Sequence, residues 1–535
     1  MVVLCGHRNK TLDIWRRWAP AEYGKVTKLS YIAEQTKAVL DLDPSRLALE
    51  YEDAVWTWGD MRAIVRSLNE KLDGLGLPEA AGVGCLLRNR PAHMGALWGV
   101  IVGERCVVTL NPVMADEKIA ADIRKMRPPV VVGSADDWDR RAVAEAAREV
   151  GAAGLLLTGD KADPVAFVPG LEKIGSGPHL ERQPGVAVLM LTSGTTGEPK
   201  RAPLGYRQLE LNIKRAARAD RNWREEDPPT LKDEVGLAFS PLVHISGMYF
   251  AVAAGVQGRP LRLLERFSVE GWRKAIRELK PKQAGGPPTA LKMIYDADLP
   301  KEELSSLVAL TCGTAGVSPD LVDAIYERYG LPVLSTYGAT EFAGAICGWS
   351  LANYQKYWKQ KRGSAGRMHP GVEARTVDPE TGEPLPPDTP GLLELRSAVI
   401  GDGQNWVKTS DLARVDPEHF LWVLGRADNA IIRGGFKVHP DEVVKALEQH
   451  PGVREASVVG VADERLGHVP VAAFIAAEGA PIPSEADLAG FLRERLAPYQ
   501  IPVKFKPVAD LPRTPSMKVS MPAVRALFEG ETVAS

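Results

Sequence analysis

The chain has 535 residues, which is too many for one compact domain and predicts two or three. Hydrophobic residues make up 45% and charged residues 25%, ordinary values for a soluble globular protein. A formal net charge of −2 gives no general attraction to nucleic acid or to an anionic membrane, so the sequence predicts neither partner.

The cysteines and the N-terminus bear on the compartment. Cys5, Cys85, Cys106, Cys312 and Cys347 have no paired spacing, which argues against a disulfide framework or a zinc site and favours a reducing environment. The first ten residues have no apolar core long enough for a signal peptide, and no run approaches the ~20 apolar residues that span a bilayer. We therefore expect a cytoplasmic protein without a membrane span, and a homodimer stays open.

The first part of the chain alternates short apolar strands with helical patterns. Strands are predicted at 82–87, 106–110, 130–133, 155–157, 235–239, 261–264 and 307–310, and helices at 91–102, 138–150, 247–256, 272–279 and 319–329. Such an order is typical of an α/β fold with largely parallel, helix-covered sheets. Ligand sites in these sheets lie in loops at the carboxyl ends of the strands.

The pattern changes after about residue 370. A turn-rich hairpin is predicted at 376–385 and a strand at 391–396, and two further strands end near residue 428, so 370–427 reads as a β-rich subdomain. Helices at 440–449 and 485–496 flank strands at 456–461 and 471–474, which indicates a small α+β domain. The predicted division is 1–427 and 428–535.

A run of small residues follows the apolar strand Val186-Ala-Val-Leu-Met-Leu191. In Thr192-Ser193-Gly194-Thr195-Thr196-Gly197, backbone N–H groups can converge on an anion and hydroxyls add donors. Lys200 adds a mobile positive charge for phosphate oxygens. The spacing is not that of a P-loop, because only Glu-Pro separates Gly197 from Lys200 and Arg201 stands where a P-loop has a hydroxyl.

This segment resembles the signature of the adenylate-forming superfamily, which comprises acyl-CoA synthetases, adenylation domains and beetle luciferases. The resemblance extends over nearly the whole chain in several motifs in the same order. It implies a large N-terminal domain, a small mobile C-terminal domain, and ATP, Mg²⁺ and coenzyme A as ligands.

Further motifs resemble the family's nucleotide-binding segments. In Ser335-Thr-Tyr337-Gly338-Ala-Thr340-Glu341 the resemblance implies that the tyrosine stacks on adenine, the threonine contacts phosphate and the glutamate binds Mg²⁺. Gly313-Thr314-Ala315-Gly316 resembles the adenine-side loop, and Asp411 and Arg426 match the ribose-binding aspartate and the arginine that follows it.

Other motifs resemble segments that act in only one half-reaction. Asp428 stands at the family's hinge, and Arg433-Gly434-Gly435-Phe-Lys437 resembles the hairpin used in the second half-reaction, with Arg433 where a small residue is usual. This arginine would contact CoA phosphates or only cap a surface. Lys518 resembles the C-terminal lysine that assists adenylation, although Met517 precedes it where glycine is usual.

Two segments point to an acyl site. His244, at a strand end, resembles the histidine or aromatic gate beside the acyl group, with a hydrogen-bonded structural histidine as the alternative. Gly285-Gly-Pro-Pro-Thr289 is expected to line the acyl pocket, with its two glycines opening space.

The hypothesis is an acid–CoA ligase that forms acyl-AMP and pyrophosphate, then acyl-CoA and AMP, from a small-molecule carboxylic acid. A hydrophobic acid (aryl, alicyclic or medium-chain fatty) is expected. The alternative is a freestanding adenylation enzyme that loads a carrier protein; a nucleotide-binding regulator and a luciferase-like oxygenase are less favoured. The expected catalytic residues are Lys518, Thr340, Glu341, His244 and Lys437.

Overall fold

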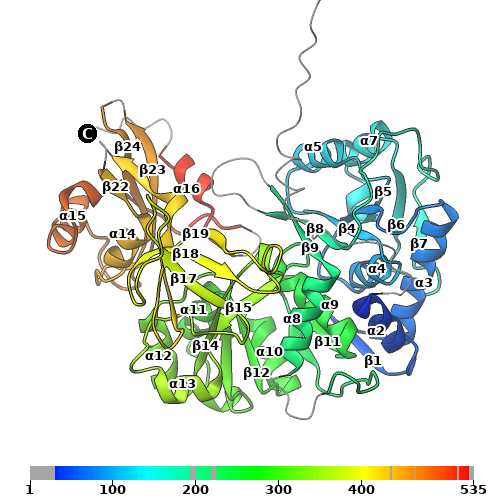
Figure 1. Ribbon diagram of the computed structural model, residues 1–535, viewed down its shortest axis with the longest axis horizontal. Coiled ribbons are helices and arrows are strands. Elements are labelled where there is room, and N and C mark those ends of the chain that lie inside the picture. The colour runs from blue at the N-terminus through cyan, green and yellow to red at the C-terminus, as the bar shows by residue number, and fades with distance from the viewer. Residues whose placement is uncertain are drawn as a thin grey trace, which may run out of the picture.

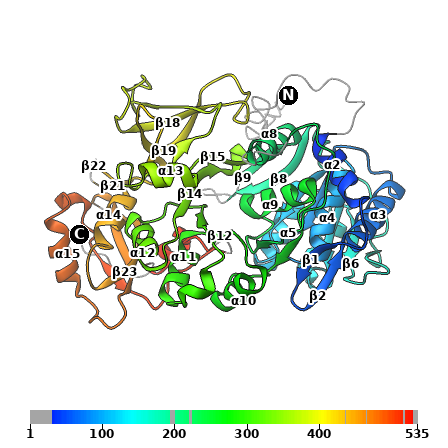
Figure 2. The same cartoon turned by 90° about the horizontal axis from the view of Figure 1, so that it is seen from below.

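The computed structural model describes residues 30–192, 200–218, 224–433, 436–463, 465–514 and 517–528. Five sheets run through these residues. The seven-stranded sheet and the small C-terminal unit lie at opposite ends of the molecule in both views, and β1 lies at the same end as the seven-stranded sheet (Figures 1 and 2). The fold therefore has the predicted α/β character and a separate C-terminal unit.

The seven-stranded sheet has the order β7-β6-β5-β3-β4-β8-β9. Its five central strands are parallel, and the edge strands β7 and β9 are antiparallel to their neighbours. The central strands are almost fully buried, which explains their continuous apolar sequences. The strands are β3 (Gly82–Leu86), β4 (Cys106–Leu110), β5 (Val130–Ser134), β6 (Ala153–Leu157), β7 (Val165–Phe167), β8 (Val186–Thr192) and β9 (Lys200–Gly205).

Helices cover both faces of this sheet. One face packs in a core with α2 (Tyr31–Leu40), α3 (Trp58–Gly74), α4 (Pro91–Val102), α8 (Tyr206–Ala217) and α9 (Ile245–Gln257). The other face packs against α5 (Asp116–Met126) and α7 (Arg141–Glu149). The single helix predicted over 138–150 is wrong at its start, because the short helix α6 (Ala135–Trp138) ends there and Arg140 has extended backbone angles.

Two further sheets carry the middle of the chain. The four-stranded sheet has the order β10-β11-β1-β2, with β1 (Leu47–Tyr51), β2 (Ala54–Thr57), β10 (Gly236–Ala238) and β11 (Leu261–Leu263). The five-stranded sheet contains β12 (Gln283–Gly286), β13 (Ala309–Cys312), β14 (Val333–Ala339), β15 (Gly344–Gly348) and β16 (Arg367–Met368). Its helical segments are α10 (Val269–Leu279), α11 (Pro288–Asp296), η1 (Lys301–Leu304), α12 (Pro319–Tyr329), η2 (Thr340–Phe342) and α13 (Leu351–Tyr357).

The β-rich segment expected after residue 370 is an antiparallel sheet of β17 (Glu373–Val377), β18 (Gly391–Arg396), β19 (Val407–Val415) and β20 (Leu421–Arg426). The 3-10 helix η3 (Ala427–Asn429) follows, at the predicted domain boundary. The C-terminal sheet comprises β21 (Ile431–Arg433), β22 (Phe436–Val438), β23 (Val453–Asp463), β24 (Gly467–Ala476) and β25 (Phe505–Pro507). It packs with α14 (Pro440–Leu447), α15 (Glu485–Arg493), η4 (Pro498–Gln500) and α16 (Met521–Ala526).

Candidate active site

The predicted phosphate loop connects the two strands of a hairpin. Thr192 at the end of β8 pairs with Lys200 at the start of β9, and the Thr192 hydroxyl donates to the Lys200 carbonyl over 3.1 Å. The predicted ligands Ser193, Gly194, Thr195, Thr196 and Gly197 lie outside the described residues. The Lys200 side chain is exposed. The segment therefore joins two antiparallel strands, unlike the strand-to-helix connection of a P-loop.

Arg201 has a structural role beside this loop. Its guanidinium donates to the carbonyls of Thr109 and Leu189, over 2.5 and 3.1 Å, and forms a largely buried ion pair with Asp122 of α5. These bonds tie β9 to β4, β8 and α5. An arginine at the P-loop's hydroxyl position is therefore explained by packing at the base of the hairpin.

Tyr337, Asp411 and Arg426, which the motifs assign to a nucleoside, come together from three strands. The Tyr337 hydroxyl donates to Asp411 Oδ2 over 2.5 Å, and Arg426 Nη1 lies 3.6 Å from Asp411 Oδ1. Arg426 also donates to the hydroxyl of Ser410. Burial and the Asp411 charge raise the pKa of Tyr337 far above its usual value, so the phenol remains a donor.

The glycines beside this group meet close packing. A Cβ on Gly338 would lie 2.3 Å from the Gly344 carbonyl on β15, so the approach of the two strands requires a glycine there. A Cβ on Gly313 would lie 3.1 Å from the hydroxyl of Thr336. In the adjacent adenine-side loop, Thr314 and Ala315 are exposed, and Thr314 has a φ of 73°, which is strained for a β-branched residue.

Glu341 is suited to a cation. Gln208 donates to its backbone carbonyl over 2.8 Å, while its carboxylate is exposed and has no ion-pair partner among the described residues. The helix η2, which begins at Thr340, packs against β9 and so lies beside the phosphate hairpin. In the described part of the chain, no three or more acidic, histidine or cysteine side chains are grouped so that they could hold a metal ion by themselves. A single carboxylate fits Mg²⁺ that is held mainly by substrate phosphates and water.

Lys518 and His244 approach this site from two domains. Burial, and then the Arg426 charge, lowers the pKa of Lys518, although its side chain retains an exposed surface. Burial and the Lys518 charge lower the pKa of His244 to about 4, so its imidazole is neutral near pH 7. His244 Nε2 is buried and has no hydrogen-bond partner among the described residues, which disfavours the alternative of a hydrogen-bonded structural histidine.

A cavity of about 1120 Å³ lies between β10, α9 and β12 and reaches Gly313, Thr314 and Thr336. Residues of β10, α9 and the ends of β12 and β13 line it, including Phe239, Tyr249, Phe250 and Gly313. Gly285 and Gly286 also line it, but the expectation that they open space is wrong. A Cβ on Gly285 would lie 1.8 Å from the Thr311 carbonyl, and one on Gly286 would lie 2.9 Å from the Phe239 ring. Both glycines therefore permit close packing.

The hairpin predicted for the second half-reaction contacts residues outside the group around Arg426. Lys437 Nζ lies 3.9 Å from Glu380 Oε1, in the segment after β17. Arg433 donates to the carbonyls of Tyr499 and Ile501, over 3.0 and 3.1 Å, which favours the capping alternative for this arginine. Gly434 and Gly435 lie outside the described residues, and so does the side chain of Asp428. Lys437 is thus not among the residues that the structure gathers around Arg426.

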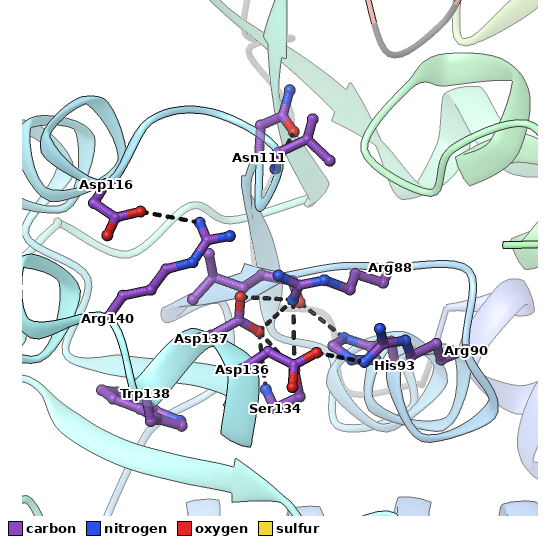
Figure 3. A network of polar contacts seen from close by, with 12 residues as sticks. Arg88, Arg90, His93, Asn111, Asp116, Ser134, Asp136, Asp137, Trp138 and Arg140 are labelled. Atoms are coloured by element: carbon purple, nitrogen blue, oxygen red, sulfur yellow. Dashed lines mark hydrogen bonds and ion pairs between the residues drawn. The ribbon is translucent and has the colours of Figure 1, made fainter. Parts of the chain in front are cut away.

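The crevice between β3 and β5 is a switch point, because the chain leaves these neighbouring strands in opposite directions. Side chains fill it (Figure 3). The fully buried Asp137 carboxylate accepts from Arg88 at 2.6 Å and from the Ser134 hydroxyl at 2.9 Å, and His93 Nδ1 lies 2.8 Å from the Leu86 carbonyl. A buried ion-pair network therefore occupies this crevice, and the candidate site lies elsewhere.

Sequence reasoning assigned no role to Ser410 and Arg513, and it placed Thr289 only in the expected wall of the acyl pocket. Ser410 accepts a bond from Arg426, and Arg513 and Thr289 contact each other and the backbone before Lys518. Ser410 and Arg513 stand inside segments that the motifs already marked. Their roles depend on partners from distant strands, which the local pattern does not reveal.

Comparison with known protein families shows to which family this chain belongs. The family described as "AMP-binding enzyme" matches residues 37–403, and "AMP-binding enzyme C-terminal domain" matches residues 442–518. The chain belongs to the AMP-binding enzymes. This confirms the resemblance read from the motifs and the presence of a distinct C-terminal domain.

The relatives of this AMP-binding enzyme include CoA ligases. It is 27% identical over 489 residues to 4-coumarate–CoA ligase-like 9 of Arabidopsis thaliana, covering 86% of this chain and 83% of the relative. It is 27% identical over 501 residues to 2-succinylbenzoate–CoA ligase of Bacillus cereus, covering 91% and 97%. The structure of o-succinylbenzoate CoA synthetase from Bacillus subtilis with ATP and a magnesium ion has a TM-score of 0.72 at 24% identity, covering 92% and 99%, and supports the fold. In the described residues, no helix has the length and apolar character needed to cross a membrane.

Proposed function

We propose that this protein is an AMP-forming acid–CoA ligase for a hydrophobic carboxylic acid, with an aryl acid favoured. The observation that carries the proposal is the Tyr337–Asp411–Arg426 group, and the turn that carries Lys518 contacts the large domain at Thr289. CoA ligases among the relatives support the acceptor. The names of these relatives contain 4-coumarate and 2-succinylbenzoate, which are acids with an aromatic ring, and this supports an aryl acid as the substrate.

The first half-reaction joins the acid carboxylate to the α-phosphorus of ATP and releases pyrophosphate. Tyr337 would stack on adenine, while Asp411 would accept bonds from the ribose hydroxyls. Lys518 would neutralise the negative charge that develops as the two anions approach. Lys518 is exposed as a whole, and its pKa is lowered by partial burial of the ammonium group and then by the charge of Arg426, so the two cations lie close enough to act on the same anion.

Mg²⁺ would neutralise charge on the ATP phosphates, and Glu341 is the residue that would hold it. The free carboxylate and its position next to β9 support this assignment. Thr340, at the start of the same short helix, would contact phosphate.

The cavity between β10 and β12 would receive the acid. Its aromatic lining, with Phe239, Tyr249 and Phe250, suits an aryl or alicyclic group. His244 Nε2 has no hydrogen-bond partner in the part of the chain that the structure describes, and it would contact the carboxylate end of the substrate.

In the second half-reaction a thiol attacks the acyl carbonyl and AMP leaves. We propose that the C-terminal domain first rotates about the segment at Asp428, which brings Gly434, Gly435 and Lys437 forward. The division into domains 1–427 and 428–535 belongs to this proposal. CoA is the favoured thiol, and a carrier-protein thiol is the alternative; CoA-dependent AMP release with the correct acid separates them.

A pair of reciprocal variants tests the assignment. We expect Lys518→Ala to slow ATP–pyrophosphate exchange on the order of 10²–10³-fold, as for the loss of one preorganised charge donor. Thioester formation from preformed acyl-adenylate should be nearly unchanged. Lys437→Ala should show the opposite pattern. Exchange would be measured with a panel of carboxylic acids. If the wild-type enzyme showed no exchange with any acid of the panel, the proposed function would be rejected.

A further inference from the structure

The turn that carries Lys518 is closed by its own backbone. Arg513 and Val519 form an isolated antiparallel bridge, Thr514 N donates to the Lys518 carbonyl over 2.7 Å, and Met517 N donates to the Thr514 carbonyl over 2.8 Å. These bonds hold the turn together. They do not by themselves fix its position against the large domain.

Arg513 makes contacts that fix this position. Its Nη2 donates to Glu455 Oε2 on β23 over 2.7 Å. Its Nη1 lies 3.3 Å from the hydroxyl of Thr289 on α11 and 3.5 Å from the Met517 carbonyl. The Thr289 hydroxyl in turn lies 3.3 Å from the same Met517 carbonyl. One guanidinium therefore touches the small domain, the large domain and the residue before Lys518.

We propose that Arg513 is a positioning residue that, with Thr289 and Glu455, holds Lys518 in place for adenylation. The inference rests on the proposed function, because it assigns a role in placing Lys518. Arg513 has no direct part in the chemistry and acts through the Met517 carbonyl.

The chemistry of the group favours arginine at this place. A guanidinium is planar and presents N–H groups in two directions, so it can bond Glu455 on one edge and Thr289 with Met517 on the other. The Arg513 side chain is 16% exposed and that of Glu455 is 28% exposed, so the pair is shielded more than a surface ion pair. Lysine could keep the bond to Glu455 but not the whole arrangement.

The same contact links Lys518 to the acid cavity. Thr289 lies two residues after Pro287, and Gly285, Gly286 and Pro287 line the cavity. The wall of the cavity and the Lys518 turn are thus joined through one hydroxyl. An acid that orders this wall would also favour the docked turn, which couples substrate binding to the placement of the lysine.

The test compares the two half-reactions in the full-length enzyme. We expect Arg513→Ala to slow ATP–pyrophosphate exchange about 10- to 100-fold, the range caused by an ångström-scale displacement of a catalytic group. Thioester formation from preformed acyl-adenylate should change less than about threefold, because that step does not use the docked turn. Arg513→Lys should recover part of the exchange rate.

Thr289→Val provides an independent variant in the large domain, which loses one hydroxyl and should fold even if Arg513→Ala does not. It should slow exchange, and the double variant should be no slower than Arg513→Ala alone, because both changes break the same link. Arg454→Ala is the matched control, since Arg454 is exposed and adjoins Glu455 on β23.

Three results would overturn the inference: normal exchange in Thr289→Val, equal loss in both half-reactions, or additive effects of the two changes. Wild-type enzyme without exchange for any acid would instead reject the proposed function. Normal exchange in the wild type together with any of those three results rejects only the role of Arg513.

Discussion

At the scale of single residues, Met517 has a backbone conformation that its side chain disfavours. It has a φ of 62°, in the left-handed region where a residue with a Cβ pays roughly 1–2 kcal/mol. Glycine, the residue usual at this place in the resembling motif, avoids that cost. The turn before Lys518 therefore keeps its shape despite methionine, supported by the bonds of Thr514 and Arg513.

Met517→Gly should favour the docked turn. Recovering about 0.5–1 kcal/mol would raise the rate of ATP–pyrophosphate exchange about 2- to 5-fold. Met517→Ile should lower the rate, because a β-branched residue tolerates a positive φ less well. Exchange kinetics of the three proteins at one temperature test this order. If exchange were slower in Met517→Gly than in Met517→Ile, backbone strain at this residue would not limit the rate.

At the scale of elements, the Arg88–Asp137 pair joins the segments that follow β3 and β5 (Figure 3). Asp137→Ala should lower the free energy of unfolding of this region by about 3–5 kcal/mol, because it leaves a nearly buried guanidinium unpaired. Asp137→Asn should cost less, since it can still bond Ser134. Denaturant unfolding followed by tryptophan fluorescence measures the change, because Trp58 and Trp98 stack at 5.5 Å in the core beside this sheet.

Asp136 offers a control in the same short helix. Its carboxylate pairs with Arg90 at 2.9 Å but is 57% exposed, so Asp136→Ala should change stability by less than about 1 kcal/mol. An equal loss from the two aspartates would show that burial does not decide the value of these pairs.

The sequence predicted the helices and strands best where the local pattern of apolar residues determines them. The predicted helix 91–102 agrees with α4 and 319–329 agrees with α12, because continuous apolar or amphipathic runs with an initial proline determine them locally. The break before α7 was missed, since Asp137 there is engaged by Arg88 from a distant segment. The motifs likewise assigned Tyr337, Asp411 and Arg426 to one site. They did not reveal the packing against Gly285 or the partners of Arg513, because these depend on residues from other strands.

At the scale of the whole molecule, the small domain touches the large one close to the predicted hinge. Asp441, at the start of α14, accepts a hydrogen bond from the Arg426 backbone, and burial raises its pKa. Gly425 has a φ of 152°, and a Cβ there would lie 2.8 Å from Asp441 Oδ2. A side chain at residue 425 would therefore force the Asp441 carboxylate to move away from β20 and would strain the backbone at this positive φ. The contact belongs to the same orientation that docks Lys518.

Gly425→Ala should therefore disfavour the orientation used for adenylation. We expect ATP–pyrophosphate exchange to fall about tenfold, which corresponds to about 1.4 kcal/mol. Thioester formation from preformed acyl-adenylate should be largely retained, because the proposed rotation gives that step another orientation. Gly479→Ala is the control: Gly479 has a φ of 74° but nothing within 4 Å of the added carbon, so it introduces backbone strain in the small domain without touching the large one. If both variants lost exchange equally, strain within the small domain would explain the loss. If Gly425→Ala slowed both half-reactions alike, the contact with Asp441 would stabilise the fold without selecting an orientation.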